Sequence, residues 1–124
     1  MNATLRWNST GITLLGVSGI NGATSNLLYL AYTLAFDSIN NLYISDYYNN
    51  RIQKLISGTS MAVTAIGDVN GTAGSGMDHL SLPAGIFFDS NDNMYVIDRG
   101  NSRIQFYIKG VTSGSTIAGK SNNF

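Results

Sequence analysis

Aspartate and arginine recur in this sequence at a fixed spacing, and this pattern is the one best suited to chemistry. Asp46 lies five residues before Arg51, and Asp98 lies five residues before Arg103. Such a set can serve as an acid–base or ion-binding site. It can also be structural, with a carboxylate at a strand end that accepts loop amides and pairs with the arginine. Because the same set occurs twice, we predict the structural role.

Two further aspartates, Asp37 and Asp89, repeat in the same way, and together with Asp68 and Asp78 they raise the question of a metal site. Their spacing fits neither an EF-hand nor a zinc template. The chain has no cysteine and a single histidine, His79, so a zinc site would lack its usual ligands. We predict no metal, no cofactor and no catalytic residue.

Composition narrows the class of partner. Seven basic residues balance seven acidic ones, and only 11% of residues are charged. A neutral chain gives no general reason to bind phosphate backbones or anionic lipid. Apolar stretches are short and the first residues lack the core of a secretion signal, which predicts no membrane insertion. The compartment stays open, with a small preference for an extracellular setting from the low charge and three Asn-x-Ser/Thr patterns.

An internal repeat organises the chain. Residues 29–55 match residues 81–107 at a shift of 52, with 11 of 27 positions identical. Residues 12–16, 63–67 and 115–119 also match one another. Each period contains four short, β-branched or aromatic segments separated by turn residues, which predicts strands. The expected strands are 34–37, 42–46, 51–56 and 62–67, then 85–89, 94–98, 103–108 and 115–119.

Four antiparallel strands in each repeat of about 50 residues are typical of a β-propeller blade. Several strands are apolar at consecutive positions, as in residues 86–88 and 95–97. A sheet that is buried on both faces needs this pattern, whereas a sheet with one wet face alternates. The predicted fold is all-β, a partial β-propeller of four-stranded antiparallel blades.

The order of residue types resembles the NHL-repeat family, in the pattern L-P-x-G-x-x-F-D, then N-x-Y-x-x-D, then N-x-R-I-Q. The first copy departs from it, with Ala31 and Thr33 in place of the proline and glycine. The residues that carry the resemblance are Leu82, Pro83, Gly85, Phe88, Asp89, Asn93, Tyr95, Asp98, Asn101, Arg103, Ile104 and Gln105.

The resemblance implies β-propellers, commonly six-bladed, that bind proteins, peptides or RNA. It divides the chain into 1–16 (outer strands of an incomplete blade, expected at 4–7 and 12–16), 17–67 (one blade), 68–119 (a second blade) and 120–124 (the truncated start of another repeat). About two and a half blades cannot close such a ring. Either the chain is a fragment of a longer protein, or copies associate to complete the ring.

The loops of one rim are the predicted ligand face. The glycine-rich segments 16–22 and 67–76 lack the following helix of a phosphate loop and read as connections between blades. They share a rim with residues 47–50 and 99–102, where the two repeats differ in side chains. The predicted contact residues are Tyr47, Tyr48, Arg99 and His79.

The sequence therefore predicts a non-catalytic scaffold that binds a protein or peptide, as in substrate recognition by a larger ubiquitin-ligase-like or signalling protein. An RNA-binding NHL propeller is the first alternative, since tyrosines stack on bases, although Arg99 is the only basic residue on the rim outside the repeat motif. A metal-dependent hydrolase or lyase of propeller type is the weaker alternative.

Overall fold

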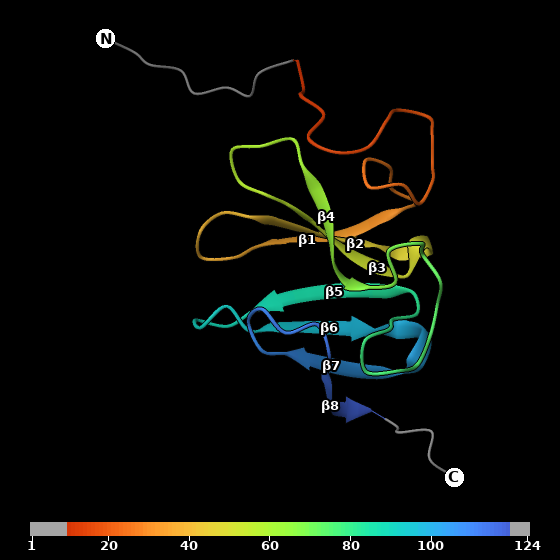
Figure 1. Cartoon of the computed structure of the whole chain (residues 1–124), viewed down its shortest axis with the longest axis vertical. Coiled ribbons are helices and arrows are strands. Elements are labelled where there is room, and N and C mark those ends of the chain that lie inside the picture. Colours follow the sequence, from red (N-terminus) through yellow and green to blue (C-terminus); the bar gives the residue numbers. More distant parts are fainter. Residues whose placement is uncertain (1–9, 120–124) are drawn as a thin grey trace, which may run out of the picture.

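The computed structural model describes residues 10–119, which form eight strands and two short 3-10 turns (Figure 1). The strands make two open, four-stranded antiparallel sheets in the orders β1-β2-β3-β4 and β5-β6-β7-β8. The all-β prediction is confirmed, and four of the eight strands have the predicted bounds.

The first sheet consists of β1 (Ala31–Phe36), β2 (Leu42–Asp46), β3 (Arg51–Leu55) and β4 (Ala62–Gly67). The second consists of β5 (Pro83–Phe88), β6 (Met94–Asp98), β7 (Arg103–Tyr107) and β8 (Ser115–Gly119). The 3-10 turns η1 (Tyr47–Asn49) and η2 (Arg99–Asn101) follow β2 and β6.

The hairpin between β1 and β2 owes its shape to the side chain of Asp37. One carboxylate oxygen of Asp37 accepts the backbone N–H of Ile39 at 3.1 Å and of Asn41 at 2.9 Å. Asn40 completes the turn with a left-handed φ of 66°, a conformation that asparagine tolerates. Burial alone would raise the pKa of the Asp37 carboxyl, but the hydrogen bonds from Asn41, Ile39 and Tyr43 hold it below its usual value.

The hairpin between β5 and β6 repeats this arrangement. Asp89 accepts the backbone N–H groups of Asn91 and Asn93, both at 2.9 Å. Asp92 takes the left-handed position, with a φ of 60°. The two predicted turns therefore have the same hydrogen bonds at the same spacing.

The two sheets stack face to face, with β1 and β2 of the first sheet against β5 of the second (Figure 1). The hydroxyls of Thr33 and Ser45 cross this interface and donate to the carbonyl of Ala84, the Ser45 bond being 2.9 Å long. The Tyr43 ring meets the Phe88 ring edge-on at 4.7 Å. The buried core of the interface consists of Tyr43, Ile52, Ile66, Leu80, Met94, Val96 and Tyr107.

Residues 12–16 differ from the prediction, because they do not form a strand. They follow an irregular path beside the first sheet, and Leu15 packs against the cluster of Leu42, Ile44 and Leu55. A strand needs a neighbouring strand for its hydrogen bonds, and among residues 10–119 none lies beside this segment. The segments predicted at 4–7 and 120–124 lie outside the described residues.

Candidate binding surface

The Asp46–Arg51 pair holds together the edge of the first sheet where β2 ends. Both side chains are buried, and the Arg51 Nε donates to Asp46 Oδ2 at 2.9 Å. The same carboxylate accepts the Tyr29 backbone N–H at 2.7 Å and the Asn49 side-chain amide at 2.9 Å. Asp46 thus fixes the chain that enters β1 and the turn that follows β2.

The remaining donors of Arg51 are used by backbone carbonyls. Nη1 donates to Ala23 at 2.6 Å and to Val69 at 2.8 Å, and Nη2 donates to Thr24 at 2.9 Å and to Leu27 at 3.2 Å. With the bond to Asp46, all five guanidinium N–H groups have a partner inside the protein. The geometry is that of a structural clamp on the loops before β1 and after β4.

The second sheet carries the same clamp. Arg103 Nε donates to Asp98 Oδ2 at 2.7 Å, and its Nη atoms donate to the carbonyls of Ser75, Gly76 and His79. Asp98 accepts the backbone N–H of Ser81 at 2.7 Å. The two buried pairs therefore perform the same task in two neighbouring sheets.

Hydrogen bonds also bring the loops of this edge together, as the sequence predicts. Asn50 is central: its side-chain amide donates to the Gly71 carbonyl at 3.0 Å, and its side-chain oxygen accepts the Leu82 backbone N–H at 2.9 Å. Asn50 has a left-handed φ of 53° that directs it toward both neighbours. The loop after β2 and the connection between the sheets consequently form one continuous rim.

Four tyrosines lie in a row on this rim, and we call Tyr29, Tyr32, Tyr47 and Tyr48 the tyrosine rim. The Tyr48 ring meets Tyr29 and Tyr47 edge-on, each at 5.1 Å between ring centroids. Tyr32 stacks on Tyr47 at 5.2 Å with an interplanar angle of 22°. Tyr47 is buried beneath the others, whereas Tyr29, Tyr48 and Tyr32 are 43%, 53% and 59% exposed. Tyr47 therefore supports Tyr32 and Tyr48, and Tyr48 in turn contacts Tyr29, so that three of the rings meet solvent.

Arg99 extends the tyrosine rim onto the second sheet. Its Nη1 donates to the Tyr47 hydroxyl, and its guanidinium carbon lies 6.0 Å from the Tyr47 ring centroid. This position is within the range of a cation–π contact. The structure thus brings together three of the four predicted contact residues, Tyr47, Tyr48 and Arg99.

Tyr29 and Tyr32 also belong to this surface, although they are not among the contact residues predicted from the sequence. The sequence does contain a signal for them. At a shift of 52, the four positions of the tyrosine rim become Ser81, Ala84, Arg99 and Gly100 in the second repeat. A comparison restricted to loop residues finds Tyr47 and Tyr48 but omits the two positions around the start of β1.

His79, the fourth predicted contact residue, lies in a separate depression. Its Nδ1 is 2.7 Å from an Asp78 carboxylate oxygen, and the depression of about 370 Å³ is also lined by Asp68 and Thr112. The hydrogen bond to His79 lowers the pKa of the Asp78 carboxyl, and that to Thr72 lowers the pKa of the Asp68 carboxyl. Asp78 is solvent-exposed and Asp68 is half-buried, and Asp78 with His79 forms an ordinary surface contact.

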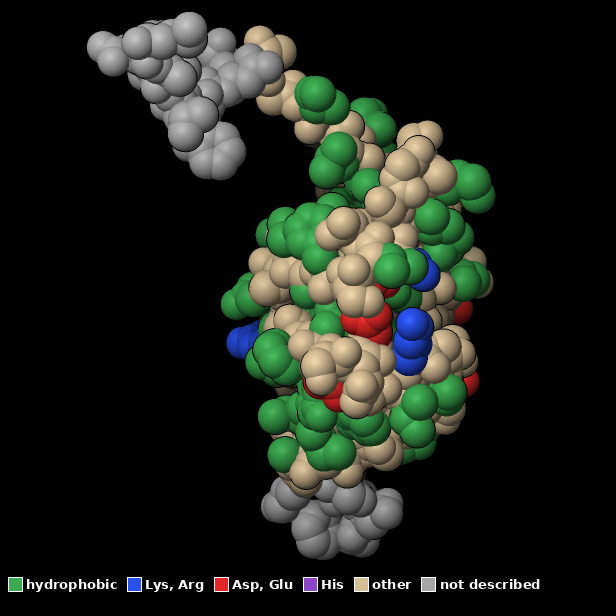
Figure 2. Space-filling view, turned by 90° about the vertical axis from the view of Figure 1, so that its left-hand side faces the viewer, with side chains coloured by type: hydrophobic (Ala, Val, Ile, Leu, Met, Phe, Trp, Pro, Cys, Tyr) green, Lys and Arg blue, Asp and Glu red, His purple; other side chains and the backbone are tan. Residues whose placement is uncertain are grey.

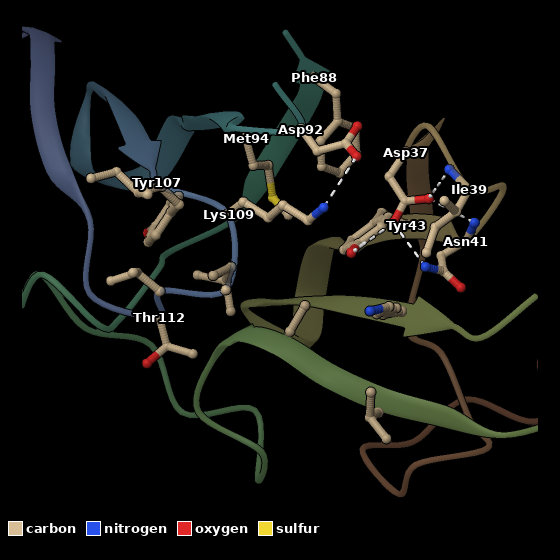
Figure 3. Close-up of a pocket in the computed structure, with 17 residues that line it drawn as sticks. Asp37, Ile39, Asn41, Tyr43, Phe88, Asp92, Met94, Tyr107, Lys109 and Thr112 are labelled. Atoms are coloured by element: carbon tan, nitrogen blue, oxygen red, sulfur yellow. Dashed lines mark hydrogen bonds and ion pairs between the residues drawn. The ribbon is translucent and has the colours of Figure 1, made fainter. Parts of the chain in front are cut away.

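A second hollow, of about 340 Å³, opens between the sheets at the opposite edge, where the hairpin turns lie (Figure 3). Its acidic groups already have protein partners: the Asp92 carboxylate accepts the Ser38 backbone N–H at 2.9 Å, and Lys109 Nζ lies 3.8 Å from it. Burial, followed by the charge of Asp37, raises the pKa of the Tyr43 hydroxyl to about 12. Figure 2 views this edge, where hydrophobic side chains are widespread and charged ones few. These contacts tie the sheets together and leave the tyrosine rim as the stronger candidate for binding.

Within residues 10–119, no three His, Asp or Glu side chains lie close enough to hold a metal ion. The helices formed by the same residues are too short and polar to cross a membrane. No family model and no curated protein matches the sequence of the chain.

Proposed function

We propose that this chain is a non-catalytic binding module built from two NHL-type β-propeller blades, residues 17–67 and 68–119, and that the tyrosine rim takes a protein or peptide ligand. The observation that carries the proposal is the row of exposed tyrosines on an edge whose framework is otherwise repeated. Tyr29, Tyr48 and Tyr32 present large, rigid rings at little cost in side-chain entropy, as binding surfaces require. Each of these rings contacts another ring of the tyrosine rim, and Arg99 contacts the buried Tyr47.

The blade interpretation is supported by the arrangement of the sheets. Each has four antiparallel strands in sequence order, and consecutive sheets stack face to face. The residues that resemble the NHL motif are the ones that build the repeated turns and buried pairs, such as Asp89, Asp98 and Arg103. A motif that recurs for structural reasons leaves recognition to the positions where the repeats differ.

Peptide is favoured over RNA by the charges on the rim. Arg99 is the single basic side chain in contact with the four tyrosines among the described contacts, and its guanidinium is engaged by Tyr47. Affinity for a nucleic acid backbone needs several cations that release counterions. A peptide with apolar or proline-rich character needs only flat aromatic surfaces with a few polar groups.

The test is selection of peptides from a displayed random library, followed by affinity measurement on a double variant, Tyr29→Ala with Tyr48→Ala. Selected peptides should lose about 2 kcal/mol or more of binding free energy, roughly thirtyfold in Kd, because the two exposed rings would be the central contacts. The melting temperature should change little, since both side chains are about half exposed.

The matched control is Ile39→Ala, which removes an exposed hydrophobic side chain at the opposite edge and should leave peptide affinity unchanged. Equal affinity of the double variant and the wild type would refute a role for the tyrosine rim. Filter binding of single-stranded RNA with a steep dependence on salt would instead favour the RNA-binding alternative.

A further inference from the structure

The outer faces of β1 and β5, one in each of the stacked sheets, are apolar and exposed, whereas Leu42 and Ile44 on the outer face of β2 are buried against Leu15 and Leu28. On β1, Thr33 points to the second sheet, so its neighbours Tyr32, Leu34 and Phe36 point away from it. On β5, Ala84, Ile86 and Phe88 face the first sheet, so Phe87 points away. Leu34 is 61% exposed and Phe87 is 65% exposed. Exposed apolar faces of this extent mark interaction sites.

The repeat relates these two faces to the interface that is already formed inside the chain. At a shift of 52, the residues that the second sheet presents to the first, Ile86, Phe88, Met94 and Val96, correspond to Leu34, Phe36, Leu42 and Ile44. Conversely, Ala35, Tyr43, Ser45 and Ile52 of the first sheet correspond to Phe87, Tyr95, Ile97 and Ile104 of the second. The outer face of each sheet therefore has the character of one half of the internal interface.

The outer faces lack the polar contact found at the centre of the internal interface. At the internal interface, Thr33 and Ser45 meet Ala84 through hydrogen bonds. The corresponding positions on the outer faces are Gly85 and Ile97 on one sheet and Tyr32 on the other. Ile97 Cδ1 already fills the space over Gly85, where a Cβ would lie 2.7 Å from it. A contact of Tyr32 with Ile97 would therefore replace the polar contact between small residues by an apolar one.

The outer face of the second sheet is also more apolar than its internal counterpart. Lys54, whose ammonium lies 5.6 Å from the Tyr43 ring centroid, is replaced at a shift of 52 by Phe106. Phe106 contacts the Tyr95 ring at 5.0 Å, and Tyr95 contacts the Phe87 ring at 6.0 Å. Three rings from three neighbouring strands thus form a continuous aromatic row on this face.

We propose that a second copy of this chain covers these faces, with the outer face of its second sheet seated on the outer face of the first sheet. The receiving face has a groove of about 560 Å³, lined by Tyr32, Leu34 and Leu42 among others. The contact is head to tail, so each copy offers one face to each of two neighbours. Such heterologous contacts build rings or growing chains.

At one corner of this interface, residues of the receiving chain already occupy the space that the incoming copy would need. Leu15 packs on the first sheet at the position that Ile66 holds at the internal interface, in line with the sequence match of residues 12–16 to residues 63–67. The strand β8 of the incoming copy would meet this segment. Association therefore requires residues 12–16 or the incoming β8 to give way, while β5, β6 and β7 make the lasting contact.

The test uses two variants, Phe87→Lys on the second sheet and Leu34→Lys on the first, in sedimentation over a wide concentration range. Wild type is expected to associate beyond a dimer, and each variant alone to remain monomeric, because every contact needs one intact face of each kind. An equimolar mixture of the variants should form one-to-one dimers and nothing larger, since only one pairing of intact faces remains. Met61→Lys, at an equally exposed hydrophobic residue in the β3–β4 turn, should associate like wild type.

Circular dichroism of each variant should match wild type, because both replaced side chains are exposed. A wild-type chain that stays monomeric at every concentration would overturn the proposal, and a different chain or a further sheet would then cover the faces. So would a mixture of variants that stays monomeric, because association of wild type would then use other surfaces. These outcomes are separate from the peptide test, which changes Tyr29 and Tyr48 only.

Discussion

The two buried Asp–Arg pairs and the tyrosine rim lie on the same edge of the molecule, yet they relate to the repeat in opposite ways. Asp46 with Arg51 and Asp98 with Arg103 have the same geometry, with Nε–Oδ2 distances of 2.9 and 2.7 Å. The tyrosine rim exists in the first repeat only, and its positions hold Ser81, Ala84, Arg99 and Gly100 in the second. The repeated Asp–Arg pairs are buried, whereas three of the four tyrosines, at positions that differ between the repeats, are exposed.

This contrast separates residues that maintain the fold from residues that are free to recognise a ligand. A buried arginine with five satisfied donors has no capacity left for a ligand, and its loss would leave a buried carboxylate unpaired. An exposed ring held by other rings can contact a ligand without cost to the fold.

Arg51→Ala should lower the free energy of unfolding by about 3–5 kcal/mol, because it leaves the Asp46 carboxylate and four loop carbonyls without their donor. Arg103→Ala should lower it by a similar or slightly smaller amount, since Arg103 makes four such bonds where Arg51 makes five. Urea denaturation measures both. The exposed Arg99→Ala is the control and should stay within about 0.5 kcal/mol of wild type.

An unchanged melting temperature after replacement of either buried arginine would contradict its role in maintaining the fold. The clearest contradiction would be an Arg103→Ala variant that folds normally and loses ligand binding. That result would make the pair part of a binding site, contrary to its interpretation as structural.

The framework could be predicted from the sequence because it repeats. Identical residues at a shift of 52, such as Asp37 and Asp89, mark positions whose backbone needs one particular side chain. Left-handed backbone positions recur at the same shift, at the identical pair Leu30 and Leu82 and also at Asn40 with Asp92 and Asn50 with Ser102. The bounds of four strands could be predicted for the same reason, since turn residues separate the strands in each repeat.

The tyrosine rim could be predicted only in part, because its members come from two separate segments. Tyr47 and Tyr48 lie in a loop that the repeat marks as variable. Tyr29 and Tyr32 flank the start of β1, and only the bend at Leu30, with a φ of 62°, brings them beside that loop. The sequence pattern also gave no reason to separate His79 from the others, because the course of the loop between β4 and β5 depends on the clamp made by Arg103.

Gly100→Tyr tests whether the second repeat is able to carry the same surface as the first. A Cβ at position 100 would lie 2.8 Å from both the Cβ and the backbone oxygen of Ser81. We expect the free energy of unfolding to fall by about 1–3 kcal/mol, because backbone has to move to make room. Tyr48 occupies the corresponding position in the first repeat.

The matched control is Gly11→Tyr, because a Cβ at Gly11 would meet no heavy atom within 4 Å. Its urea denaturation should stay within about 0.5 kcal/mol of wild type. If Gly100→Tyr is as stable as this control, the difference between the repeats is a matter of side-chain choice alone, and the backbone places no limit on it.

The smallest expected effect concerns the buried tyrosines Tyr43 and Tyr107, whose pKa values burial raises to about 12. Both hydroxyls stay neutral in the folded state at a pH where the unfolded chain, with a pKa of about 10, already ionises. Their contribution to stability is therefore complete below about pH 10 and is lost as the pH rises toward about 12. Urea denaturation from about pH 8 to about pH 11 should show a steeper fall in the free energy of unfolding for wild type than for the double variant Tyr43→Phe with Tyr107→Phe.

The control is Tyr95→Phe, at the position of the outer face that corresponds to Tyr43. It keeps both buried phenols, so its free energy of unfolding should fall as steeply as that of wild type. If the free energy of unfolding falls equally steeply with pH in wild type and in the double variant, the interface between the sheets does not raise the pKa values of these two phenols.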